Sequence, residues 1–221
     1  MQKLVLFDFD GTLVDSAPDL AASANYIRTL QDLTPLPLDH LRPYASMGAR
    51  GLLKAALDLD TDHPDYETQK NLFLDHYAAN STTHSDLFDG VDILISQLND
   101  IGIKWGVVTN KAVHLTQPIM EHFNLSASSK VLVGGDSTAH IKPHPASLFL
   151  ACEKTGIAPA DCIYIGDDER DIVAGKAAGM ATVVAAYGYC DFDPAIASWQ
   201  ADGIASHATE IFPIILQWLH R

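Results

Sequence analysis

Two aspartates in the segment DFDGT are the residues of this sequence best placed to do chemistry. Asp8 and Asp10 follow directly after a short apolar run at residues 4–7. Alternate residues of a strand share a face, and two neighbouring carboxylates are costly unless a cation or a shared proton compensates them. Gly11 suits an ordinary turn after a strand, but a turn does not explain paired carboxylates. We therefore expect Asp8 and Asp10 to form a reactive pair.

Two further segments offer groups that bind anions. The apolar run 104–109 ends in Thr109 and is followed by Asn110. The Thr109 hydroxyl and the backbone amide of Asn110 could bind phosphoryl oxygens, although both residue types are also common where helices begin. Lys142 stands in the segment KPHP, in which two prolines stiffen the backbone. Most lysines are simply solvated, but one held in this way would present a fixed positive charge to an anion.

An acidic cluster, GDDERD at residues 166–171, completes the set. Acids at a helix N-terminus often serve only as partners of the helix dipole, and some of these have that role. Asp167 stands at the end of an apolar run, and Asp171 would share a helix face with it at i,i+4 spacing. Carboxylate ligands suit Mg²⁺, a hard cation that prefers oxygen. Together the segments contain a nucleophile, fixed positive charge and a cation site, the components of phosphoryl transfer.

The elements that must position these groups alternate between strands and helices. Helical spacing predicts helices at 91–98 and 145–155, each closed by a glycine. Near-continuous apolar strands between helices are typical of a parallel sheet covered on both faces. We therefore predict an α/β fold with a doubly wound parallel sheet, whose ligands bind beyond the carboxyl ends of the strands. The expected strands are 3–9, 104–109, 130–134, 162–166 and 181–185.

One long interval breaks this alternation. Between the first two expected strands the sequence has only helix-like patterns, at 18–33, 52–57 and 66–77. This insertion is too long for a single crossover helix, so it predicts a small α-helical domain inserted after the first strand. We expect a core domain of residues 1–16 and 86–221, and a helical cap domain of residues 17–85.

Composition excludes several classes of function. The chain of 221 residues has a net charge of −14, which disfavours nucleic acid and anionic lipid as partners. No apolar stretch approaches the ~20 residues that span a bilayer, and no signal peptide is present, so we expect a soluble cytoplasmic protein. Cys152, Cys162 and Cys190 are too few and too widely spaced for a disulfide framework. A small phosphate ester is the expected partner of a monomer or homodimer.

In their order along the chain, these segments resemble the haloacid dehalogenase superfamily of phosphohydrolases. The matching segments are DFDGTLVDS, TNK, KPHP and GDDERD. The resemblance implies that Asp8 is a nucleophile forming an aspartyl-phosphate and that Asp10 acts as acid and then as base. It implies Mg²⁺ held by Asp8, the backbone carbonyl of Asp10 and Asp167. The phosphoryl group would be bound by Thr109, Asn110 and Lys142.

Within that superfamily the sequence is similar to phosphoglycolate phosphatases, and in part to N-acetylmuramic acid 6-phosphate phosphatases. The expected cap loop implies that Arg50 grips the remote end of a substrate, although a surface arginine is an equal alternative. Many relatives have serine at the position of Asp168, so either Asp168 or Asp171 could contact the metal or its waters. The alternative from another class is a catalytically silent protein that binds phosphorylated ligands. Every expected catalytic position is filled, which favours the enzyme.

Overall fold

The computed structural model describes residues 2–189 and 195–220, and it divides the chain into two compact units. The first unit comprises Met1–Val14 and Leu87–Arg221, and the second comprises Asp15–Asp86. The two short strands β2 (Val14–Asp15) and β3 (Asp86–Leu87), where the chain passes from one unit to the other, pair as a small sheet of their own. No helix in the described part of the chain is long and apolar enough to cross a membrane.

The first unit is built on a parallel sheet, and the predicted α/β class is confirmed. In the described residues the sheet has the order β5-β4-β1-β6-β7-β8, with every strand parallel to its neighbours. β8 is a strand that the sequence patterns did not predict, because it is only three residues long. The strands are β1 (Leu4–Phe7), β4 (Lys104–Val108), β5 (Leu132–Val133), β6 (Cys162–Gly166), β7 (Ala181–Ala185) and β8 (Gly203–Ala205).

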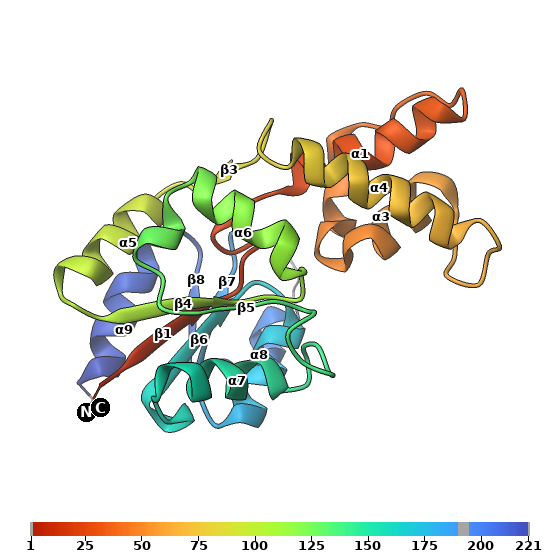
Figure 1. Ribbon diagram of the computed structural model, residues 1–221. Helices are drawn as coiled ribbons and strands as arrows, with labels where there is room; N and C mark the ends of the chain where they lie inside the picture. The colour runs from red at the N-terminus through yellow and green to blue at the C-terminus, as the bar shows by residue number, and fades with distance from the viewer. Residues whose placement is uncertain (1, 190–194, 221) are drawn as a thin grey trace. The chain divides into compact units, whose positions relative to one another are not determined.

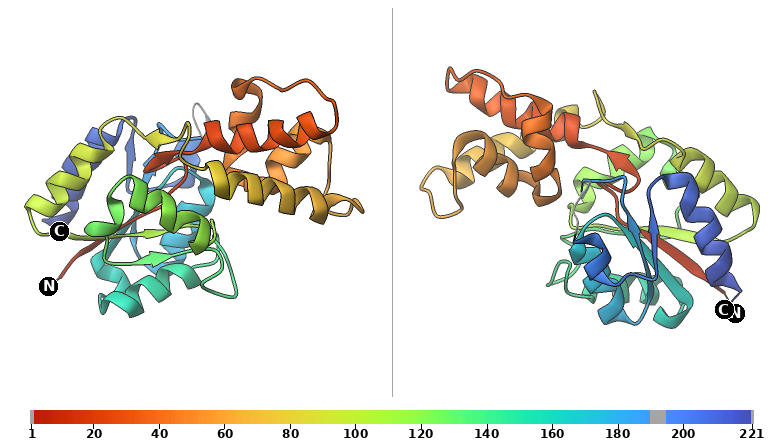
Figure 2. Two further views of the ribbon diagram at one scale, coloured as in Figure 1. Left: turned by 45° about the horizontal axis from the view of Figure 1, so that its top comes forward. Right: turned by 180° about the vertical axis from the view of Figure 1, so that it is seen from behind.

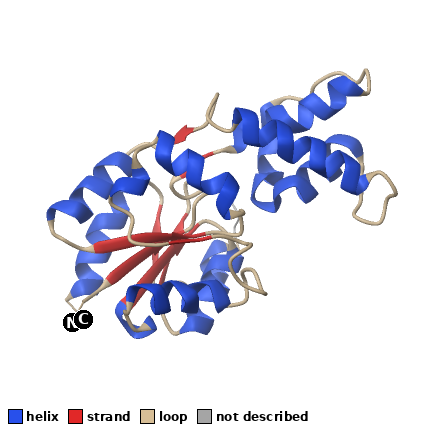
Figure 3. Ribbon diagram, viewed as in Figure 1, coloured by secondary structure: helices blue, strands red, loops and turns tan. Residues whose placement is uncertain are grey.

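Helices cover both faces of this sheet (Figures 1 and 3). One face carries α5 (Val91–Asp100), α6 (Val113–His122) and α9 (Ile211–Leu219). The opposite face carries α7 (Ala146–Thr155) and α8 (Glu169–Ala178). Single 3₁₀ turns complete the connections: η2 (Leu125–Ala127), η3 (Pro159–Asp161), η4 (Ile196–Trp199) and η5 (Ala208–Glu210).

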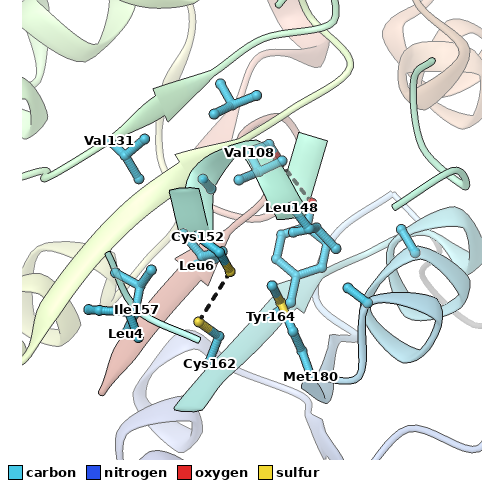
Figure 4. Packing of buried hydrophobic residues seen from close by; sticks show 14 residues of the cluster. Leu4, Leu6, Val108, Val131, Leu148, Cys152, Ile157, Cys162, Tyr164 and Met180 are labelled. Carbon is cyan, nitrogen blue, oxygen red and sulfur yellow. Dashed lines mark hydrogen bonds between the residues drawn. The ribbon is translucent and has the colours of Figure 1, made fainter. Parts of the chain in front are cut away.

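The core follows from the alternation of side chains along buried strands. Leu4 and Leu6 of β1 pack with Tyr164 of β6 in the cluster beneath α7 and α8 (Figure 4). Phe7 instead packs its ring against Trp105, with centroids 6.3 Å apart. All four residues of β1 are buried, as expected of a central strand covered on both faces.

Two cysteines lie in the same cluster. The Sγ atoms of Cys152 on α7 and Cys162 on β6 lie 3.7 Å apart, and both thiols are free and buried. They act as apolar filling of the core, as free cysteines commonly do. Cys190 lies outside the described residues.

The second unit is helical. Its long helices α1 (Ala17–Leu30) and α4 (Tyr66–Asn80) pack on each other and on α3 (Gly48–Leu57), and Phe73 and Tyr77 of α4 are buried. The buried carboxylate of Asp19 on α1 accepts hydrogen bonds from the backbone N–H groups of His84 and Ser85 and from the Ser85 hydroxyl. The unit comprises α1 (Ala17–Leu30), α2 (Leu38–Leu41), η1 (Arg42–Met47), α3 (Gly48–Leu57) and α4 (Tyr66–Asn80).

The strand order places the chemistry-bearing segments side by side. β1 lies between β4 and β6, so the loops that follow these three strands leave the same edge of the sheet next to one another. Figure 2 shows the sheet and its covering helices from two further directions. In open α/β sheets such an edge is where ligands bind.

Candidate active site

Asp8 is the first residue after β1, and it is held by contacts on both its backbone and its side chain. Its backbone N–H donates to the Ile165 carbonyl at 2.8 Å. Its Oδ1 lies 2.8 Å from the ammonium nitrogen of Lys142. Burial and the charge of Asp171 raise the pKa of Asp8 from 3.8 to about 7, while Lys142 acts in the opposite direction. At neutral pH and with no metal bound, the Asp8 carboxyl is therefore close to half ionised.

Lys142 is buried, and its ammonium group is fixed by acceptors on several sides. It donates to Asp171 Oδ1 at 2.6 Å, to the Tyr164 hydroxyl at 2.8 Å and to the Val108 carbonyl at 3.3 Å. Burial lowers the pKa of Lys142, but the charges of Asp171 and Asp8 outweigh burial and raise it above its ordinary value. The lysine is therefore charged, and it offers that charge directly beside Asp8.

Asn110 holds the backbone of Lys142 in place. The Asn110 side chain donates to the Lys142 carbonyl at 3.1 Å and accepts from the Lys142 N–H at 2.9 Å. The sequence predicted only that the backbone amide of Asn110 binds a phosphoryl group. The two hydrogen bonds by which its side chain joins the two loops were not predicted. Thr109 is buried, and its hydroxyl accepts from the Lys111 N–H at 3.2 Å. Thr109, Asn110 and Lys142 thus come together at one edge of the sheet.

Asp8 and Asp10 are paired with different lysines. The chain turns sharply after Phe9, and Gly11 takes a left-handed φ of 82° that favours glycine. Asp10 Oδ1 lies 2.5 Å from the ammonium nitrogen of Lys111, and both side chains are largely buried. Sequence reasoning did not select Lys111, although it ends the TNK segment. Its place in the loop after the buried strand β4 was visible in the sequence, but its pairing with Asp10 was not.

Asp167 follows β6 and is held by neutral donors. The Thr12 hydroxyl donates to its Oδ1 at 3.1 Å, and the Tyr189 N–H donates to its Oδ2 at 2.8 Å. Burial raises the pKa of Asp167 well above its ordinary value, and the charges of Asp8 and Asp171 add to this effect. A carboxylate in this position needs a compensating cation to ionise.

The helical-face relation predicted for Asp167 and Asp171 is wrong. The helix α8 begins at Glu169, so Asp167 lies before it and Asp168 is its N-cap. Asp168 accepts from the Arg170 N–H at 2.9 Å and pairs with its guanidinium, while Asp171 accepts from the Asp168 N–H at 3.1 Å. Asp168 is therefore committed to capping, and Asp171 reaches Asp167 because the chain turns between them.

The residues present fit a divalent cation. Asp8, Asp167 and Asp171 each offer a carboxylate oxygen, and these three atoms lie within 4.8 Å of one another. All three carboxyls are buried, and oxygen donors at this density are what a hard cation such as Mg²⁺ prefers. Asp171 already binds Lys142 tightly. A bound cation would therefore stabilise the ionised forms of Asp8 and Asp167 most, because burial raises the pKa of both.

Arg50 belongs to the second unit. It lies on α3 and its side chain is exposed. The positions of the two units relative to each other are not determined. The substrate contact expected for Arg50 therefore stays a prediction.

Comparison with known proteins gives one family. A sequence profile of haloacid dehalogenase-like hydrolases matches residues 5–185. The chain is 41% identical to a phosphoglycolate phosphatase of Xanthomonas campestris, over 95% of each chain. It is 39% identical to an N-acetylmuramic acid 6-phosphate phosphatase of Pseudomonas aeruginosa, over 96% of this chain and 94% of that one.

A solved structure has the same fold as this chain. A predicted phosphoglycolate phosphatase from Haemophilus somnus superposes with a TM-score of 0.86 at 32% identity, covering 97% of this chain and 98% of that one. The profile covers most of the chain, the two curated relatives span nearly all of it, and the superfamily resemblance of the sequence motifs is thereby confirmed. The chain belongs to the family of haloacid dehalogenase-like hydrolases.

Proposed function

We propose that this chain is a Mg²⁺-dependent phosphate monoester hydrolase in which Asp8 is the nucleophile. The observation that carries the proposal is the pairing of Asp8 with Lys142 at 2.8 Å while Asp10 pairs separately with Lys111. Two carboxylates two residues apart are thus held by separate cations and can have separate tasks. The names of the relatives, which are phosphatases, support the same reaction class.

In the first step, an Asp8 oxygen forms a bond to phosphorus as the bond from phosphorus to the ester oxygen breaks. Asp10 donates a proton to the departing oxygen, and an aspartyl-phosphate remains. In the second step, Asp10 takes a proton from water, the water oxygen attacks phosphorus, and the bond to Asp8 breaks. Phosphate and an alcohol are the products, and Asp8 and Asp10 regain their starting states.

The remaining groups bind charge. Lys142, the Thr109 hydroxyl and the Asn110 N–H would bind the oxygens of the transferring group. Mg²⁺ would be held by Asp8, the backbone carbonyl of Asp10 and Asp167, and it would offset the negative charge of nucleophile and phosphoryl group. Asp171 keeps Lys142 in place, and Asp168 keeps α8 in place.

For the substrate, we propose phosphoglycolate first and N-acetylmuramic acid 6-phosphate second. Both compounds join a phosphate ester to a carboxylate, which would suit a cation such as Arg50 at the remote end. Residues 17–85 would form the cap domain that covers this end, and residues 1–16 with 86–221 the catalytic core. The two relatives at 41% and 39% identity differ in the substrate they are named for, which is why both compounds belong in the assay.

The test compares phosphate release from both compounds by wild type and Asp8→Asn, with Mg²⁺ or with EDTA. Wild type should release phosphate from at least one of the two compounds when Mg²⁺ is present and from neither in EDTA. The rate of release by Asp8→Asn with Mg²⁺ should be at least about 10³-fold lower, on the order expected for removing a nucleophile. Asp100→Asn, at an exposed position at the end of α5, is the matched control and should retain full activity. Near-normal turnover by Asp8→Asn would refute the mechanism. Phosphate binding without any turnover by wild type would favour the silent binding protein.

A further inference from the structure

The segment Tyr187–Tyr189 follows β7 directly and lies against Asp167 on the neighbouring strand tip. The Tyr189 N–H donates to Asp167 Oδ2 at 2.8 Å. Gly188 is buried, and a Cβ added there would lie 2.1 Å from the Gly11 carbonyl oxygen and 2.4 Å from the Asp167 Cβ. Only a glycine lets the backbone approach this closely, so the packing at Gly188 determines how near the amide of Tyr189 comes to the carboxylate.

The DFDGT turn contacts Asp167 from another side. The Thr12 hydroxyl donates to Asp167 Oδ1 at 3.1 Å. A Cβ added at Gly11 would lie 2.2 Å from Asp167 Oδ2. Each oxygen of Asp167 therefore accepts one hydrogen bond, and backbone from two loops packs against the carboxylate.

The two loops are also joined to each other. The Tyr187 hydroxyl donates to the Thr12 carbonyl at 2.8 Å. The ring of Phe88 packs edge-on against Tyr187, with centroids 5.2 Å apart, and also meets Tyr189. Tyr187 thus holds the residue whose hydroxyl contacts Asp167, and Phe88 supports the segment from outside.

Asp167 differs from the other buried carboxylates of the site in its partners. Asp8 and Asp171 both contact the ammonium group of Lys142, at 2.8 and 2.6 Å. Among the described residues, no lysine or arginine forms an ion pair with Asp167. Its contacts are neutral donors that orient the two oxygens without neutralising them. Such an arrangement gives Asp167 no cationic partner of its own, so the charge it acquires on ionising is compensated by a bound cation.

We propose that residues 187–189 are a positioning element that orients Asp167 for a divalent cation, with Gly188 as the residue that makes the close approach possible. The inference rests on the proposed function, in which Asp167 holds Mg²⁺. Groups that orient a metal ligand typically affect metal affinity by 10- to 100-fold. The segment should therefore determine Mg²⁺ affinity in the absence of any substrate.

The experiment is a calorimetric titration of Mg²⁺ into metal-stripped protein, with no substrate present. Gly188→Ala should raise the dissociation constant about 10- to 100-fold. Gly106→Ala is the matched control, because a Cβ in the middle of β4 would lie 2.4 Å from Val131 Cγ1, a comparable crowding. This control should lose thermal stability but bind Mg²⁺ within about twofold of wild type, since Gly106 packs on Val131 rather than on a carboxylate.

Tyr187→Phe is a second, milder variant that removes one hydroxyl and adds no atoms. It should weaken Mg²⁺ binding about three- to tenfold, and it decides the matter if Gly188→Ala does not fold. A folded Gly188→Ala that binds Mg²⁺ as wild type does would overturn the proposal, as would unchanged binding by Tyr187→Phe when only that variant folds. If wild type itself binds no divalent cation, the cation of the proposed function fails, and the positioning role fails with it.

Discussion

Replacing the proposed nucleophile should stabilise the metal-free protein at neutral and higher pH. Burial and Asp171 raise the pKa of Asp8 from 3.8 to about 7. Between these values the native state holds a proton that the unfolded chain has lost, so the free energy of unfolding falls as the pH rises. At 1.36 kcal/mol for each pH unit, the ionised carboxylate costs the native state about 4 kcal/mol above pH 7.

Asp8→Asn removes this titration. The free energy of unfolding of the variant minus that of wild type should increase by about 3 kcal/mol between pH 5 and pH 8, because two of those pH units lie below the raised pKa. Urea titrations in EDTA, followed by tryptophan fluorescence, measure this difference. All three tryptophans, Trp105, Trp199 and Trp218, belong to the first unit, so the signal reports the unfolding of the unit that contains Asp8.

The same titrations include a control variant and a measurement with Mg²⁺ added back. Asp100→Asn removes an exposed carboxylate and should leave the pH dependence of wild type unchanged. Mg²⁺ at 100 times its dissociation constant should add about 2.7 kcal/mol to wild type and much less to Asp8→Asn. A variant-minus-wild-type difference in the free energy of unfolding that stays constant or decreases from pH 5 to pH 8 would refute the reasoning about the buried carboxylate.

Two further substitutions test the lysines of the site. Lys111→Met removes the 2.5 Å partner of Asp10, and kcat for an alkyl phosphate should fall at least 10-fold more than kcat for p-nitrophenyl phosphate, whose leaving group needs no proton. Equal losses on both esters would contradict a role through Asp10. Tyr164→Phe removes the 2.8 Å acceptor of Lys142, and kcat/KM should fall about 10-fold with an unchanged far-UV circular dichroism spectrum. A kcat/KM equal to that of wild type would show that Asp8 and Asp171 suffice to hold the lysine.

The residues at the strand tips were predictable because a parallel sheet brings the carboxyl ends of its strands to one edge. Asp8, Thr109 and Asp167 each stand at the end of a recognisable apolar run, and Lys142 lies in the loop after another, so their order along the chain indicated that they would meet. β8 escaped prediction, since three residues beginning with Gly203 give too short a period-2 pattern.

Other parts of the site depend on contacts that no local pattern encodes. Lys111 looks like an ordinary solvated lysine until the turn at Gly11 brings Asp10 beside it. The relation between Asp167 and Asp171 was misread, because the helix begins two residues later than the spacing suggested. Sequence indicates which groups converge, but the partner of each group is decided by backbone turns of one or two residues.

The buried Asp19 carboxylate has a consequence for how such proteins diversify. Asp19 lies near the start of the second unit, and its partners His84 and Ser85 lie near the end of that unit. Their hydrogen bonds therefore hold the first and last segments of the unit together. An insertion closed in this way adds little loop entropy to the domain that carries it, because its ends are already held together. The helices between them can therefore change in length and composition without loosening the sheet. If the second unit covers the substrate as proposed, selection for a new substrate can act on that unit while the sheet and its loops stay unchanged.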